Sequence, residues 1–345
     1  MTPTNSLTIN LGGDLDLPIL SQDQLTILNT DLGTIDLTIN GEDGKDVVNV
    51  TGTLTAGNVT INAEKIDITG TINAVADGDS VGSVTLAASD TDDGEILPNG
   101  SLGGTFDGLF VALPEATIDV SGMITAAGDL AMTAMAAAQN LTITRSEFGG
   151  VIAANLVGIM PTATIGLAWA TISAANILAA TSVDVDIAFE DAADGNGGES
   201  TTTDAAISLV LVGDLFGAGL GLGASTTMTG GSLTTTGTVA LTAVSDLNVS
   251  STADGSGGVF GATLGVTEVN SATLASVDGG SINASGAVTV SSTLTSVISA
   301  ASTSTSGGSE DGGGTNQSEK RLDDANNDGD TKDAANTESG LSLIH

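Results

Sequence analysis

One short pattern recurs along this chain and constrains its fold more than any other feature. It consists of an apolar residue, two or three small residues, a glycine, one further residue, and then alternating apolar and polar residues, as in TGTLTAGNVTINA. Alternation with a period of two places the apolar side chains on one face of a strand. The pattern therefore predicts a strand, a tight corner and a second strand, repeated in residues 51–63, 121–134, 230–243 and 279–292, with a weaker copy in 171–181.

The glycine of each copy is expected to form the corner. Glycine adopts positive φ without steric cost, and a tight corner commonly requires it. In the weaker copy we align Asn176 with the glycine, and asparagine is the other residue that often adopts the left-handed region. The sequence thus predicts positive φ at this corner, at Gly57, Gly128, Gly237 and Gly286.

The spacing of the copies favours a solenoid. Ile172 follows Ile124 by 48 residues, and Ile282 follows Leu233 by 49. We interpret this interval as two coils of about 20–25 residues each. A row of immunoglobulin-like sandwiches is the alternative, but no copy carries the aromatic signature of such domains and the repeat is too short for one. We therefore predict an all-β fold, a parallel β-helix, over residues 1–305.

Composition agrees with a folded but strongly acidic protein. The formal charge is −36, from 42 acidic and 6 basic residues, and 40% of the residues are hydrophobic. Binding to nucleic acid or to anionic lipid needs lysine and arginine, so neither is expected as a partner. The chain has no cysteine, which excludes disulfides and thiolate metal ligands.

The copies TGTLTAGNVTINA and GGSLTTTGTVALTA resemble the repeats of filamentous-haemagglutinin-like exoproteins and other large repetitive adhesins of Gram-negative bacteria. The resemblance covers roughly residues 30–305 and is one of pattern. It implies a right-handed β-helix rod at the cell surface or in the extracellular space. It also implies partners among host, neighbouring-cell or other extracellular surface ligands.

A calcium loop is the sharpest site candidate. Oxygen ligands at alternate positions, with glycine at the turn, suit an ion that takes six to eight hard ligands. The segment DDANNDGDTKD offers them, with Asp333 as a substitute for the missing twelfth-position glutamate: Asp324, Asn326, Asp328, Asp330 and Asp333. The alternative for residues 306–340 is a solvated linker, because Gly, Ser, Asn and Asp dominate there.

The two ends of the chain and one uncharged stretch each lead to an expectation of their own. The start of the chain lacks the basic and apolar regions of a signal peptide, so the export signal is expected elsewhere. Residues 341–345, LSLIH, are expected to be a non-native tail that contains the only histidine, His345. Residues 148–183 carry no charge, but they contain Pro161 and the weaker repeat copy, so we expect buried solenoid and no membrane insertion.

An enzyme is not expected. Without cysteine or a usable histidine, nucleophile–base pairs of the Ser–His or Cys–His kind are impossible. Asp184 and Asp186 are a possible carboxylate pair on one strand face, but one tryptophan and six phenylalanines offer few platforms for sugar rings. We expect a non-catalytic stalk of a large secreted or surface-displayed adhesin. The alternatives are a rod that binds glycans directly and a carbohydrate-active β-helix enzyme.

Overall fold

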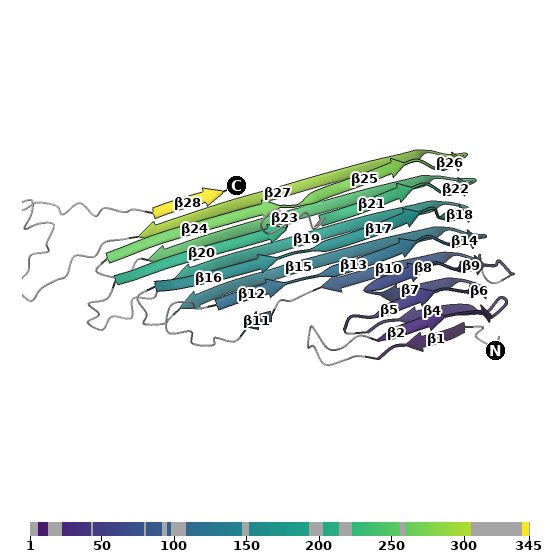
Figure 1. Cartoon of the computed structure of the whole chain (residues 1–345), viewed down its shortest axis with the longest axis horizontal. Coiled ribbons are helices and arrows are strands. Elements are labelled where there is room, and N and C mark those ends of the chain that lie inside the picture. The colour runs from purple at the N-terminus through teal and green to yellow at the C-terminus, as the bar shows by residue number, and fades with distance from the viewer. Residues whose placement is uncertain are drawn as a thin grey trace, which may run out of the picture.

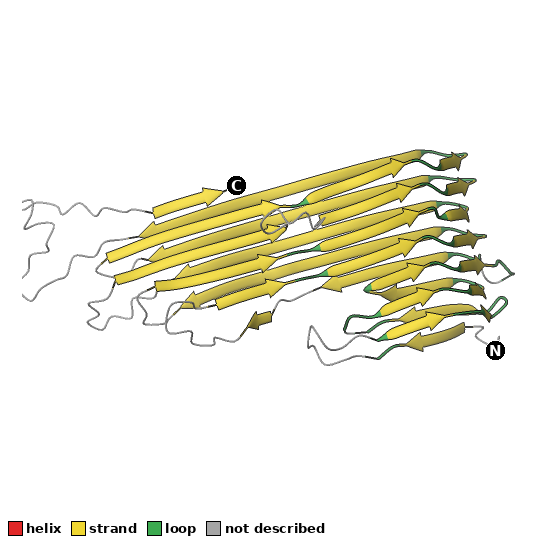
Figure 2. Ribbon diagram, in the orientation of Figure 1, coloured by secondary structure: helices red, strands yellow, loops and turns green. Residues whose placement is uncertain are grey.

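The structure is a computed structural model in which every regular element is a β-strand (Figure 2). It describes residues 6–12, 23–42, 44–78, 81–91, 95–97, 108–146, 152–192, 203–213, 223–255, 260–304 and 340–344. The strands stack in four sheets and pair in parallel, apart from one antiparallel pair. The predicted parallel β-helix is therefore confirmed (Figure 1).

Three sheets form the faces of every coil, and the chain visits them in the order A, B, C. Sheet A contains β1 (Ser6–Asn10), β4 (Asp36–Asn40), β7 (Val59–Ala63), β10 (Val84–Thr91), β15 (Leu130–Ser146), β19 (Ile177–Ala192), β23 (Val239–Gly255) and β27 (Val288–Ser304). Sheet B contains β2 (Gln24–Ile27), β5 (Val47–Val50), β8 (Lys65–Ile68), β13 (Glu115–Val120), β17 (Thr162–Ala168), β21 (Gly223–Thr229) and β25 (Ala272–Asp278). Sheet C contains β3 (Thr30–Asp31), β6 (Thr53–Ala56), β9 (Thr71–Ala74), β14 (Met123–Ala126), β18 (Thr171–Ala174), β22 (Ser232–Thr235) and β26 (Ser281–Ala284).

A fourth sheet, D, is inserted between sheets A and B in the later coils. Its strands are β11 (Glu95–Leu97), β12 (Gly108–Ala112), β16 (Ile152–Ile159), β20 (Thr203–Gly213), β24 (Phe260–Asn270) and β28 (Gly340–Ile344). β11 pairs antiparallel with β12, whereas β28, which overlaps the expected tail at residues 341–345, pairs in parallel with β24. Ser251 of β23 and Thr267 of β24 are hydrogen-bonded at 2.8 Å, so sheet D packs against the extended part of sheet A.

The coils widen along the chain, and this corrects the predicted coil size. Asn58 and Ser83 precede the paired strands β7 and β10 and are 25 residues apart, which is the length of one narrow coil. Asp129 and Asn176 hold the same place in consecutive wide coils and are 47 residues apart. The recurring interval between repeat copies is thus one wide coil and not two narrow ones. Strands of sheet A grow from 5 residues in β7 to 17 in β15, and sheet D supplies the return path (Figure 1).

The interior consists of apolar stacks that run from coil to coil. The apolar residue that opens each repeat copy lies in sheet C, in register with its counterparts: Leu54, Ile72, Ile124, Ile172, Leu233 and Ile282. All of these except Ile282, in the last coil, are at most 1% exposed. The inward positions predicted from period two are therefore confirmed, and burying each such side chain contributes about 1.5–3 kcal/mol.

Hydroxyl groups replace some of these apolar side chains in the wider coils. Thr181 and Thr226 are buried, and their hydroxyl oxygens lie 3.1 Å apart. The Thr226 hydroxyl donates to the carbonyl oxygen of Thr242 at 2.7 Å. Buried polar groups cost little when they are hydrogen-bonded, so threonine can line this interior without a large penalty.

Candidate functional site

A line of short polar side chains follows the corner between each sheet C strand and the next sheet A strand. We call it the corner ladder, and its members stand in register one coil above another: Asp36, Asn58, Ser83, Asp129, Asn176 and Thr238. The backbone N–H of Asn58 donates to Asp36 Oδ1 at 2.6 Å, and that of Ser83 donates to Asn58 Oδ1 at 2.9 Å. Such side-chain acceptors satisfy backbone donors at corners, where the strand pairing is interrupted.

The ladder continues through the wide coils. The N–H of Asp129 donates to Ser83 Oγ at 3.2 Å, and Asn176 Nδ2 donates to Asp129 Oδ1 at 2.8 Å. Asn176 Oδ1 in turn accepts from the N–H of Thr238 at 2.9 Å. One asparagine therefore links three coils through its side chain.

The repeat glycines lie beside this ladder, but the predicted reason for them is wrong. None of the four has positive φ. A Cβ atom on Gly57 would lie 2.5 Å from the carbonyl oxygen of Thr34, and one on Gly237 would lie 2.6 Å from that of Ala175. Glycine is needed because the coils approach each other closely at this corner, with similar contacts at Gly128 and Gly286.

The alignment of the weaker repeat copy also needs correction. The pairing of β15 with β19 puts Asn176 level with Asp129, so Ala175 is the residue level with Gly128. Asn176 is a member of the corner ladder and does not have positive φ. Among the described residues other than glycine, positive φ occurs at Trp169.

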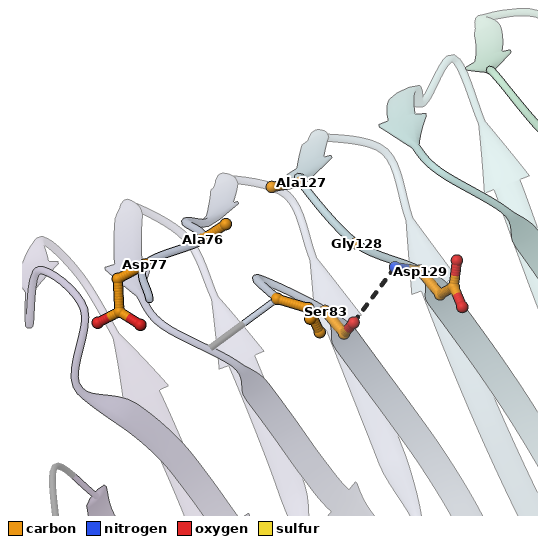
Figure 3. A pocket seen from close by; sticks show the side chains of 7 residues that line it. Ala76, Asp77, Ser83, Ala127, Gly128 and Asp129 are labelled. Atoms are coloured by element: carbon orange, nitrogen blue, oxygen red, sulfur yellow. Dashed lines mark hydrogen bonds between the residues drawn. The ribbon is translucent and has the colours of Figure 1, made fainter. Parts of the chain in front are cut away.

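An open pocket interrupts the same corner (Figure 3). Residues 75–83 connect β9 to β10, whereas residues 57 and 58 suffice between β6 and β7, so the pocket forms beside a longer connection. The pocket has a volume of about 490 Å³ and is lined by Ala76, Asp77, Val81, Ser83, Ala127, Gly128 and Asp129. Its polar groups are two carboxylates and a hydroxyl, which form no nucleophile–base pair.

Two acidic residues meet at the corner between sheets A and B. Asp46 is 2% exposed, and its backbone N–H donates to Glu64 Oε2 at 2.6 Å. Burial is the largest cause that raises the pKa of Glu64, from 4.5 to about 7, and the charges of Asp46 and Asp90 add to it against two backbone hydrogen bonds. Glycine at position 41 leaves room for this arrangement, since a Cβ there would lie 2.5 Å from Asp46 Oδ2.

A second acidic pair stands on the outer face of sheet B. Asp67 and Asp119 are in register on β8 and β13. Burial raises the pKa of Asp119, the charge of Asp67 raises it further, and the charge of Lys65 opposes the increase. The pair is therefore an acidic patch partly neutralised by one lysine.

Asp184 and Asp186 lie on one face of β19, as the sequence predicts, but each accepts a hydrogen bond from the side chain of a neighbouring strand. They alternate with the buried residues Val185 and Ile187. Asp184 accepts a hydrogen bond from the side chain of Gln139, and Asp186 Oδ1 accepts one from Asn248 Nδ2 at 2.9 Å. These bonds make the two aspartates part of the ordered outer surface of sheet A.

The only tryptophan of the chain lies at the corner between sheets B and C. Trp169 is 74% exposed and has a φ of 62°. Its ring lies against Gly230 of the next coil, where a Cβ would be 2.6 Å from a ring carbon. A non-glycine residue held in this region costs of order 1–3 kcal/mol, and such residues occur preferentially at functional sites.

The predicted calcium ligands, Asp324, Asn326, Asp328, Asp330 and Asp333, lie outside the described residues. In the part of the chain that the structure describes, no group of three or more acidic or histidine side chains could hold a metal ion. The calcium prediction thus remains untested.

Comparison of the chain with known protein families, with curated proteins and with solved structures found no match. Among the residues described, there is no helix of the length and apolar character needed to cross a membrane. The assignment of the fold therefore rests on the strand pairing within this chain and not on a relative.

The corner ladder and the Asp46–Glu64 pair were missed in the sequence. A signal for the ladder was present, because the residue after the glycine is Asn58, Asp129 or Thr238 in three of the copies. All three are short polar residues that commonly hydrogen-bond to backbone. The acidic pair gave no such signal, since its partners come from different coils.

Proposed function

We propose that this chain is a non-catalytic stalk segment of a large secreted or surface-displayed bacterial adhesin. In this proposal residues 324–333 bind a calcium ion. The observation that supports the stalk is the continuous parallel stacking of sheets A, B and C from β4 to β26, with a register shift at a bulge between Ala138 and Leu141 of β15. In such a solenoid each coil rests on the previous one, so the sheets form a continuous scaffold along the stacking axis.

The outer surface is compatible with a position outside the cell. Period two leaves Thr60, Thr85 and Ala131 in register on the outside of sheet A, between buried neighbours. The net charge of −36 keeps such a surface soluble and opposes nonspecific association. In this proposal the partners are ligands on host cells, neighbouring cells or other extracellular surfaces, and neither nucleic acid nor membrane insertion is involved.

Direct glycan binding by the rod is a second candidate, and Trp169 favours it. An exposed indole on a rigid corner offers a flat apolar face, and protein sites for amphipathic ligands often use such aromatic side chains. The sequence contains no tyrosine, so Trp169 dominates the fluorescence of the chain. Titration with neutral oligosaccharides would change this fluorescence if a sugar ring stacks on the indole.

Competition for adhesion tests the stalk against the binding rod. The purified chain is added in excess to cells of the bacterium that carries the gene. The attachment of these cells to their target surface is then measured. A stalk leaves attachment unchanged, whereas a rod that itself binds glycans competes and reduces it. Antibodies against the chain should label the cell exterior in electron microscopy, and labelling confined to the cytoplasm would exclude both functions.

A further inference from the structure

The outer face of sheet C repeats one chemical pattern in six consecutive coils. In each of the strands β6, β9, β14, β18, β22 and β26, the second residue is the inward apolar residue described above, so the first and third residues point outward. We call these outward residues the outer array: Thr53 and Thr55, Thr71 and Asn73, Met123 and Thr125, Thr171 and Ser173, Ser232 and Thr234, and Ser281 and Asn283. We propose that the outer array binds ice. The proposal goes beyond the stalk function and does not depend on it.

The members of the outer array stand on a regular grid. Strand pairing keeps one column in register from Thr53 to Ser281 and the other from Thr55 to Asn283. Neighbouring strands lie about 4.8 Å apart and alternate residues of a strand about 6.6 Å apart, so the array extends about 24 Å along the stack. Each of its strands has 4 residues, in narrow and wide coils alike (Figure 1). The grid is therefore unchanged where the other sheets widen.

The fold does not require the chemistry of the outer array. An outward position of a strand needs a polar side chain, and lysine, aspartate or glutamate would also serve there. None of the twelve residues is charged, although the chain has 42 acidic and 6 basic residues. The outer face of sheet B differs, because it carries Lys65, Asp67 and Asp119. Eleven residues of the array bear a hydroxyl or an amide group, and the exception is Met123.

A partner that contacts every position of such a grid must itself repeat. Protein partners have irregular surfaces, and their binding energy is concentrated in aromatic and arginine side chains, which the array lacks. Sugar rings pack on aromatic side chains, and these are also missing from the array. The surface of an ice crystal is an uncharged lattice of water molecules that repeats in two directions on a scale of a few ångströms. Ice therefore resembles the array in charge and in the scale of its repeat.

Threonine, which supplies six of the twelve residues, suits contact with ice. Its hydroxyl group donates and accepts hydrogen bonds, so it can replace a water molecule at the edge of the lattice. Its methyl group leaves liquid water when it packs against the crystal, which is favourable. Its branched side chain has few rotamers, so little conformational entropy is lost on binding.

Slow freezing of a solution of the 345-residue chain tests the proposal. A cold probe freezes part of the solution, and the fluorescence of Trp169 after thawing measures the protein in the ice. The wild type should enter the ice, whereas serum albumin is excluded from it. Thr125→Lys puts a long charged side chain on the grid and should reduce the protein in the ice about tenfold. The matched control is Thr227→Lys, which changes an outward residue of sheet B between the buried Thr226 and Met228 and should have no effect.

A variant that completes the array gives a second test. Met123→Thr replaces the one residue without a hydroxyl or amide group, so it should increase the protein in the ice. Met123 is 40% exposed, so this change leaves the core intact, and it decides the question if circular dichroism shows that Thr125→Lys does not fold.

Four outcomes would overturn the proposal. The first is exclusion of the wild type from ice, including the case in which it binds microcrystalline cellulose instead. The second is equal uptake of the wild type and folded Thr125→Lys. The third is a loss that Thr227→Lys shares, which would mean that added positive charge and not the array is responsible. The fourth is unchanged uptake of Met123→Thr.

Discussion

Gly122 lies at the corner between β13 of sheet B and β14 of sheet C, and replacing it by alanine tests whether the close approach of neighbouring coils requires glycine there too. Gly122 has a φ outside the positive region, so alanine adds no backbone strain of its own. Its new Cβ would lie 1.9 Å from the carbonyl oxygen of Gly70 and 2.8 Å from that of Thr69. Both are backbone atoms and cannot rotate away. The Gly70 oxygen also accepts the N–H of Met123 at 2.9 Å, and this bond must lengthen when the coils separate.

The expected loss follows from these two effects. Overpacking costs about 1–3 kcal/mol and a lost backbone hydrogen bond about 1 kcal/mol, so Gly122→Ala should lower the free energy of unfolding by about 3 kcal/mol. The control is Gly78→Ala, because a Cβ on Gly78 would meet no atom within 4 Å. This control should change stability by less than about 0.5 kcal/mol.

Urea unfolding followed by circular dichroism measures both variants. An unchanged slope against urea would show that the midpoint reports stability alone. If Gly122→Ala and Gly78→Ala have the same midpoint, close approach is not why glycine occupies this corner.

Three further perturbations address the acidic pair, the corner ladder and the calcium segment. Burial raises the pKa of Glu64 from 4.5 to about 7, so its contribution to stability is greatest below pH 4.5 and is lost as the pH rises to 7. Glu64→Gln should therefore gain stability relative to the wild type over this range, by roughly 1–2 kcal/mol after solvent screening, and parallel pH profiles would contradict the assignment. Asn176→Ala removes side-chain bonds to two coils and should cost about 1–2 kcal/mol in urea unfolding, whereas no loss would mean that water replaces the ladder. Calcium should raise the melting temperature more than magnesium at equal ionic strength, and the double variant Asp324→Ala with Asp328→Ala should lose the difference. Equal effects of the two ions would identify the segment as a linker.

The alternation of side chains was predictable because it is a local property of strands. Period two puts Leu54, Val59 and Ile61 of the first repeat copy on one face, and all three are 0% exposed. The width of the coils was not predictable in the same way. The repeat identifies one corner per coil. It does not contain the residues that set the length of the sheet A and sheet D strands, and so it does not predict the coil length.

The site was harder to predict than the fold, because its members come together only through register. Asn176 was aligned with the glycines, but the pairing of β15 with β19 puts it one position further, in the corner ladder. Glycine is selected both where a Cβ atom has no room and where φ is positive, so the sequence alone does not show which of the two applies. They can be distinguished only when the neighbouring coil is known, and that neighbour is distant in the chain. Ladder partners are 46 residues apart at Ser83 and Asp129, and 62 residues apart at Asn176 and Thr238.

The change in coil width has a consequence for the order of folding. The bond from Asn58 to Asp36 spans 22 residues, whereas the bond from Thr238 to Asn176 spans 62 residues. Closing the longer loop costs about 0.9 kcal/mol more in chain entropy. If the contacts formed are equally favourable, this slows the formation of the wide coil roughly fivefold. We therefore expect the narrow coils to form first and to serve as the template on which each wider turn is laid. Pulse-labelled hydrogen exchange should show protection of residues 44–74 before residues 177–192 and 223–243, and the reverse order would show that the wide coils nucleate instead.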